Sequence, residues 1–251
     1  MSLPIALYPM AALSAFAGLL VPEIAERAAL GKQAENRRLC ERAITLALWF
    51  GMGIGGMLAA NALPLAEAVY DNRSAGFYLA LLAPIIPVMY LDHVTDVMLK
   101  GLGRQVYAMG VNILDSVGSI LLVLLLLPSY GAAGYVLVIA IAEIFNFACS
   151  ITGLYRVLPF RFPLLRAVLF PAAAVLFAVT LTRCIPLPTG IFGLLLSFCL
   201  SAILYIAVLL LFCRLAGEGE KKKAPAAALD RRAPFGYNSC IYGRNIKGEG
   251  K

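Results

Sequence analysis

Charged residues are scarce in this chain of 251 residues. Asp, Glu, Lys and Arg make up 14% of it, against roughly 25% in an ordinary soluble domain. Hydrophobic residues make up 61%, and the mean hydropathy is +0.86. This balance excludes a soluble globular protein. The single histidine and the absence of any Cys-x-x-Cys spacing among the six cysteines give no indication of a zinc site or a disulfide framework.

What is abundant is long apolar sequence. A helix needs about 20 apolar residues to cross the bilayer core. Seven windows meet this length, and we expect a helix in each: 3–21, 43–63, 77–99, 108–127, 132–152, 167–184 and 190–212. The predicted fold is therefore all-α, a polytopic membrane helix bundle with about seven transmembrane helices over residues 1–215. The polar remainder, 216–251, is predicted to be a disordered cytoplasmic tail.

The basic residues give the bundle an orientation, because Lys and Arg are enriched in cytoplasmic loops. The formal net charge is +7, and 19 of the 21 Lys and Arg residues fall in every second loop or in the tail. The alternate loops hold only Arg73 and Arg183. The C-terminus is therefore predicted to be cytoplasmic, and an odd number of crossings places the N-terminus outside the cytoplasmic membrane. Membrane topology therefore accounts for the net positive charge, and the sequence does not indicate a nucleic-acid partner.

The start of the first apolar window is unusual for such a topology. It begins almost at Met1, with no basic segment in front of it, so a signal peptide is disfavoured. We expect these residues to follow an upstream half of the protein. The segment 22–42, in which acidic and basic residues alternate, is expected to extend the first two helices beyond the membrane.

Polar residues within apolar windows are the first candidates for function, because carboxylates in hydrocarbon are costly and usually face a cavity or a partner. The candidates for transport or ion coupling are Asp92, Asp96, Asp115, Glu143, Asn112 and Asn146. Such groups exchange a proton or bind a sodium ion, so one of these ions is a possible coupling ion, and no other cofactor or metal is expected. The competing interpretation is an internal network in which Asp96 and Lys100 tie two helices together. His93 is expected to make an interhelical hydrogen bond.

Helix breakers and small residues are the second informative class. Pro84 and Pro87 interrupt the third window and are hinge candidates, since discontinuous helices allow transporters to bend. Pro9 and Pro171 are expected only to fit helices to their neighbours. The glycines of Gly51-Met-Gly-Ile-Gly-Gly56 have GxxxG spacing within an apolar run, which predicts close helix packing and not a nucleotide loop.

Several of these stretches resemble a known family. They are Leu20-Val-Pro-Glu-Ile-Ala-Glu26, Leu82-Ala-Pro-Ile-Ile-Pro-Val-Met-Tyr-Leu-Asp-His93, Leu99-Lys-Gly-Leu-Gly103, 107–116 and Glu143-Ile-Phe-Asn-Phe147. Over about residues 1–215 the chain resembles the stage V sporulation protein B group of polysaccharide exporters. This group belongs to the multidrug/oligosaccharidyl-lipid/polysaccharide exporter superfamily, with the MATE transporters and the lipid II flippases.

The resemblance implies a flippase that moves undecaprenyl-linked saccharide across the cytoplasmic membrane by alternating access, in cell-wall or spore cortex polysaccharide synthesis. Members have about fourteen helices in two lobes, and the seven windows look like the C-terminal lobe. The expected partners are membrane lipid, the lipid-linked saccharide, and an N-terminal lobe or a second chain. Because the substrate's pyrophosphate is anionic, Lys100 and Arg104 are the candidates for phosphate contact.

Three other classes compete with this interpretation. A cation-coupled multidrug exporter of the MATE type would share the fold. A retinal receptor would need a lysine in its last helix, and 190–212 contains no charged residue. An intramembrane lipid-saccharide enzyme would need Asp92 and His93 as a catalytic pair, but neighbouring residues on a helix point about 100° apart. We therefore expect a transporter and no enzymatic activity.

Overall fold

The structure is a computed structural model, and it describes residues 2–160, 164–186, 188 and 190–227, with side chains for 8–160, 167–186, 188, 190–212 and 214. The chain forms two compact units, Met1–Leu209 and Leu210–Lys251. The first unit contains all the packed helices discussed below. In its described part, the second consists of the last turns of α7, which continue to Ala227 and so differ from the disorder predicted for 216–227. The rest of the predicted tail lies outside the described residues.

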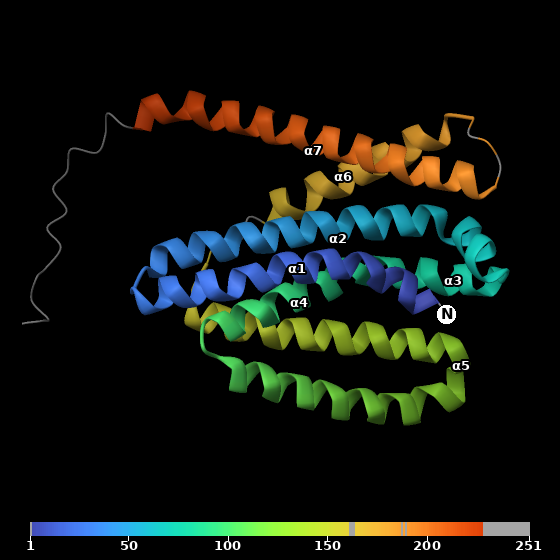
Figure 1. Cartoon of the computed structure of the whole chain (residues 1–251), viewed down its shortest axis with the longest axis horizontal. Helices are drawn as coiled ribbons and strands as arrows, with labels where there is room; N and C mark the ends of the chain where they lie inside the picture. Colours follow the sequence, from blue (N-terminus) through green and yellow to red (C-terminus); the bar gives the residue numbers. More distant parts are fainter. Residues whose placement is uncertain (1, 161–163, 187, 189, 228–251) are drawn as a thin grey trace, which may run out of the picture. The chain divides into compact units, whose positions relative to one another are not determined.

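All regular structure in the described residues is helical, as expected (Figure 1). The elements are α1 (Ser2–Ala29), α2 (Gln33–Tyr70), α3 (Arg73–Leu82), the short 3-10 helix η1 (Ala83–Ile85), α4 (Ile86–Gly101), α5 (Gln105–Val157), α6 (Leu164–Arg183) and α7 (Ile191–Ala227). Five described segments are long and apolar enough to cross a membrane, namely Tyr8–Ala29, Gln33–Tyr70, Arg73–Gly101, Gln105–Val157 and Ile191–Phe212, and the apolar segment Ala167–Arg183 is shorter. The chain is a polytopic helical membrane bundle.

The 53 residues of α5 contain two of the predicted spans. The backbone leaves helical geometry at Gly131, where φ is 57° and ψ is −136°, a conformation open to glycine and strained for other residues. The chain turns back here, so that a first arm (105–130) and a second arm (132–157) run side by side (Figure 1). The Tyr107 hydroxyl donates a hydrogen bond to the Cys149 carbonyl at 2.8 Å, which ties the two arms together.

The end of α1 agrees with the predicted extension of the first helix beyond residue 21. The helix α1 continues through Pro22 to Ala29. Proline removes one backbone donor and thereby weakens a single turn. Two features of the following turn offset this loss: Ile24 is fully buried, and Arg27 pairs with Glu23 one turn away. The polar extension of the first two helices therefore forms as expected, in α1 and in the first turns of α2.

The main core lies where α2 packs against η1 and α4. A Cβ atom on Gly51 would lie 2.8 Å from Pro87 Cα, and one on Gly55 would lie 2.8 Å from the Ala83 carbonyl oxygen. These distances leave no room for a side chain, so the predicted role of the glycines in close packing is confirmed. The aromatic rings of Phe50 and Tyr90 stack across the same interface, with centroids 5.8 Å apart.

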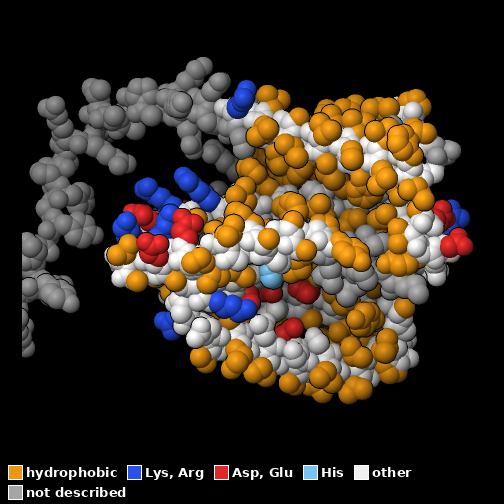
Figure 2. All heavy atoms as spheres, in the orientation of Figure 1, with side chains coloured by type: hydrophobic (Ala, Val, Ile, Leu, Met, Phe, Trp, Pro, Cys, Tyr) orange, Lys and Arg blue, Asp and Glu red, His pale blue; other side chains and the backbone are white. Residues whose placement is uncertain are grey.

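Lys and Arg side chains gather at one end of the first unit (Figure 2). The α1–α2 and α4–α5 connections lie at this end (Figure 1), and Leu158 and Pro159, which follow α5, border the same pocket as Gln33 at the start of α2. Arg73 lies beyond the far end of α2, where it pairs with Glu67 at 3.0 Å. The basic loops thus share one end, as the predicted topology requires.

Candidate functional site

The polar residues predicted from the sequence fall into two groups in space. We call the first the polar site, formed by Asp92, Asp115, Glu143, Asn146 and Ser150 from α4 and both arms of α5. The second is an ion pair between Asp96 and Lys100, which lies at the end of α4 that carries the basic loops. Both groups lie in the first unit.

Asp92 is the most deeply buried carboxylate of the polar site, with 8% of its surface exposed. It projects from α4 toward the second arm of α5, where the Asn146 side-chain amide donates a hydrogen bond to Asp92 Oδ2 at 2.9 Å. Ser150, one turn further along α5, lies beside the same carboxylate. Glu143, Asn146 and Ser150 have i, i+3, i+7 spacing, which places them on one face of the helix.

Asp115 and Glu143 face each other across the two arms of α5. They line a cavity of about 400 Å³, whose other walls are mostly apolar, including Val123, Leu124 and Val138. Asp92 and Asp115 both lie within electrostatic range of Glu143. Three carboxylates from α4 and α5 are therefore brought together.

Several oxygens of the polar site have no hydrogen-bond partner in the part of the chain that the structure describes. Asp92 Oδ1, Asp115 Oδ1 and Asn146 Oδ1 are buried atoms with no partner among the described residues. Buried polar atoms are normally satisfied, so such atoms mark a place where a proton, an ion or another protein group can bind. No group of three His, Cys, Asp or Glu residues in the described part of the chain is arranged to hold a metal ion.

Asp96 and Lys100 form their ion pair within α4, with Lys100 Nζ and Asp96 Oδ2 2.6 Å apart. The pair therefore does not link two helices, which corrects the interpretation that it ties the third and fourth windows together. The reason is the i, i+4 spacing, which puts both side chains on one face of the same helix.

Lys100 also borders a pocket of about 430 Å³ along the first arm of α5, together with the exposed Asn112. Arg104, the other residue predicted to contact phosphate, is exposed in the α4–α5 connection and does not line this pocket. The structure thus places one of the two cations beside a pocket, with its charge already paired to Asp96.

His93 faces α1 and not the polar site. Its Nε2 lies 2.9 Å from Ser14 Oγ, and the Ser14 hydroxyl donates to the Met10 carbonyl at 2.9 Å. Because the single hydroxyl proton is used there, the arrangement requires Nε2–H of His93 to be the donor. The predicted interhelical hydrogen bond is present, and Asp92 and His93 contact different helices.

The two hinge candidates lie at the junction between α3 and α4. Pro84 is in η1, and Pro87 is in the first turn of α4. A second proline bend was not predicted from the sequence. Pro64 lies inside α2, and the backbone leaves helical geometry three residues earlier, at Asn61, where φ is −111° and ψ is 15°. The signal was present, since a proline removes the donor for the carbonyl four residues before it.

In this second bend, the carbonyl left without a helical donor is that of Ala60. Arg183 Nη2 at the end of α6 donates to it at 2.8 Å. The Asn61 side chain, in turn, donates to the Met57 carbonyl at 3.0 Å. The bend in α2 is therefore held by a side chain from another helix.

The class of protein follows from these observations: a polytopic helical membrane bundle with carboxylates within its apolar helices. No protein-family model matches the sequence, and no curated protein matches it. Among solved structures, the fold is similar to that of a protein described as lipid II flippase MurJ, inward closed conformation, with a TM-score of 0.66 and 14% sequence identity. The match covers 85% of this chain and 47% of that one, so the chain spans about half the length of its structural neighbour.

Proposed function

We propose that this chain supplies one lobe of a flippase-type transporter, which moves a lipid-linked saccharide across the cytoplasmic membrane by alternating access. The fold likeness to half of a lipid II flippase supports this proposal, and so does the resemblance to polysaccharide exporters. A role in cell-wall or spore cortex synthesis belongs to the same proposal. The predicted orientation, with the C-terminus in the cytoplasm, would put the basic loops on the side where such substrates are made.

One observation of the site carries the proposal. The first arm of α5 is apolar and mostly exposed, yet it presents Asp115 to a cavity without a partner for Oδ1 among the described residues. A carboxylate at membrane depth without a function would be costly. A second lobe, supplied by another part of the protein or by another chain, would enclose this face and form the other wall of the transport path.

Within this proposal, the acidic groups couple transport to an ion and do not hold the substrate. Asp92, Asp115 and Glu143 would repel a pyrophosphate, but they suit a proton or sodium ion, with Asn146 and Asn112 as neutral oxygen ligands. Lys100 and Arg104 remain the candidates for phosphate contact. Pro84 and Pro87 would allow α4 to bend as the lobes move.

A cation-coupled drug exporter of the MATE type is the second candidate, favoured by the acidic character of the polar site. An intramembrane enzyme has less support, because Asp92 and His93 are engaged with α5 and α1 respectively. Because the two side chains point toward different helices, they cannot act together on one substrate atom as a catalytic pair.

The test is a transport assay on the assembly that the tagged chain forms in its native membrane. After reconstitution into vesicles, a lipid-linked saccharide is scored for sidedness with an impermeant reagent, and a lipophilic cationic dye is scored in parallel. We expect the saccharide to change sides faster than in empty vesicles, without a covalent product. Transport of the dye alone would favour the drug exporter, and a new covalent product would favour the enzyme.

The ion-coupling part needs an imposed proton or sodium gradient. Asp92→Asn, Asp115→Asn and Glu143→Gln are each expected to weaken the dependence of transport on the gradient. Asp71→Asn, in the connection between α2 and α3, is the matched control and should leave it unchanged. Unaltered gradient dependence in all three site variants would overturn this part of the proposal.

A further inference from the structure

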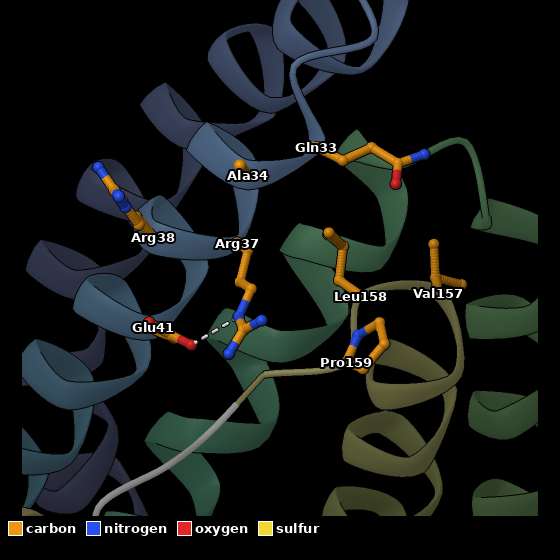
Figure 3. A pocket seen from close by; sticks show the side chains of 8 residues that line it. All are labelled: Gln33, Ala34, Arg37, Arg38, Glu41, Val157, Leu158 and Pro159. Carbon is orange, nitrogen blue, oxygen red and sulfur yellow. Dashed lines mark hydrogen bonds and ion pairs between the residues drawn. The ribbon is translucent and has the colours of Figure 1, made fainter. Parts of the chain in front are cut away.

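A pocket of about 620 Å³ lies at the end of the first unit that carries the basic loops, away from the polar site. One wall is the first part of α2, with Gln33, Arg37, Arg38 and Glu41. The opposite wall is apolar and comes from the end of α5 and the residues after it (Figure 3). The pocket is therefore basic on one side and apolar on the other.

The two arginines have different positions in this pocket. Figure 3 shows Arg37 reaching toward Pro159, with Glu41 beside it, whereas Arg38 projects from another side of α2. Arg37 Nε lies 3.0 Å from Glu41 Oε1. This contact uses the Nε–H donor, and the guanidinium group has four further N–H donors. Arg38 is exposed and has no ion-pair partner among the described residues.

We propose that this pocket binds the phosphodiester headgroup of an anionic phospholipid. Guanidinium groups bind phosphate oxygens through paired hydrogen bonds, and basic pockets between transmembrane helices are recognised sites for anionic headgroups. The apolar wall of Val157, Leu158 and Pro159 suits the glycerol and the first methylenes of a lipid, which a free phosphate ion lacks. The site is formed by the chain itself and does not depend on the proposed transport function.

The position of the pocket agrees with a lipid ligand. It lies where α2 begins and α5 ends, beside the basic connections, and both helices are long and apolar enough to cross a membrane. The headgroup region of a bilayer begins where the apolar part of a spanning helix ends, and Arg37 and Glu41 come just before the apolar window 43–63 of α2. Binding there would hold the ends of α2 and α5 together from outside the helix core.

The test uses the full chain in detergent, titrated with phosphatidylglycerol or phosphatidylcholine and analysed by native mass spectrometry. We expect retention of phosphatidylglycerol over phosphatidylcholine, and a loss of about fivefold in apparent affinity for Arg37→Gln, from one fewer basic contact. Arg73→Gln, at the far end of α2 and also ion-paired, is the matched control and should bind as the unaltered chain does. Equal retention of the two lipids, or equal losses in the two variants, would overturn the proposal.

A second variant separates binding from misfolding. Glu41→Gln removes the carboxylate that competes for Arg37, so it should raise the affinity for phosphatidylglycerol, a gain that an unfolded protein would not show. Inorganic phosphate added at the same phosphate concentration should fail to displace the lipid. Displacement by inorganic phosphate would reject the lipid headgroup in favour of a free phosphate, and an unchanged or lowered affinity in Glu41→Gln would overturn the role of Arg37.

Discussion

The span formed by α3, η1 and α4 and the span formed by the first arm of α5 carry similar polar residues in different surroundings. In the apolar stretch of Arg73–Gly101, half of the residues are buried, whereas in the apolar stretch of Gln105–Val157 only 6% are buried. Both Asp92 on α4 and Asp115 on the first arm of α5 have an Oδ1 without a partner in the described chain, but Asp92 Oδ2 accepts a hydrogen bond from Asn146 of α5. The side chains of α4 are therefore enclosed by the first unit itself, while the first arm of α5 presents an apolar face that is open to lipid or to another protein surface.

The exposed side chains support this difference. Leu124 and Leu125 on the first arm are 66% and 69% exposed, and in water such a continuous apolar face would be unstable. Tyr90 on α4 is fully buried. A larger side chain should therefore lower the stability where it meets α4 and leave it unchanged or raise it on the first arm of α5.

The largest effect is expected for alanine at Gly51 of α2, which faces Pro87. Gly51→Ala should destabilise the lobe by about 1–3 kcal/mol, because the new Cβ would overlap the backbone of α4. Gly118→Ala, on the first arm of α5 with open space around it, should stabilise the chain by up to about 1 kcal/mol through helix propensity. Thermal unfolding in detergent, followed by the fluorescence of the single Trp49, measures both.

A larger side chain at Gly118 tests whether another protein surface covers the first arm of α5. If a second lobe covers the first arm, Gly118→Leu should leave the isolated chain stable but weaken its assembly, which size-exclusion chromatography of the purified complex would detect. A Gly118→Ala variant as unstable as Gly51→Ala would show instead that the first arm is packed, contrary to the comparison.

The second prediction exchanges the two carboxylates for leucine. Asp92→Leu should destabilise the lobe by about 1–3 kcal/mol, because the buried Asn146 amide loses its acceptor. Asp115→Leu should be neutral or stabilising in the isolated chain, since it removes a desolvated group that lies near Glu143. Both variants are compared by the same unfolding measurement. Equal destabilisation by the two changes would contradict the view that α4 is complete and the first arm is not.

The sequence predicted the helical class and the approximate position of each apolar segment, because apolar length and Lys/Arg placement depend on local composition. It also predicted the polar residues of α4 and α5. It did not predict that Ser150 joins Asp92, although 143, 146 and 150 share a helical face, and it did not connect Arg37 with Pro159. Contacts between residues far apart in the chain depend on how helices pack, which no single window contains.

The bend in α2 allows a third prediction, on the link between α6 and α2. Arg183→Met removes the donor to the Ala60 carbonyl and should cost about 1 kcal/mol of stability. In a Pro64→Ala background the backbone N–H of residue 64 can take that role, so the same change should then cost close to nothing. A double-mutant cycle of thermal stabilities tests this. An equal cost of Arg183→Met in both backgrounds would show that Arg183 acts elsewhere.

The smallest effect is expected at the exposed end of α4. Lys100→Gln breaks the ion pair with Asp96, but the Lys100 side chain is 48% exposed, so the change should alter stability by only about 0.5 kcal/mol or less. Because Lys100 borders the pocket along the first arm of α5, the same variant should slow saccharide transport in the assembled protein if the lysine contacts the substrate's phosphate. Arg104→Gln, outside that pocket, provides the comparison. A stable Lys100→Gln variant with unchanged transport would remove Lys100 from the substrate path and leave the pair as a local helix contact.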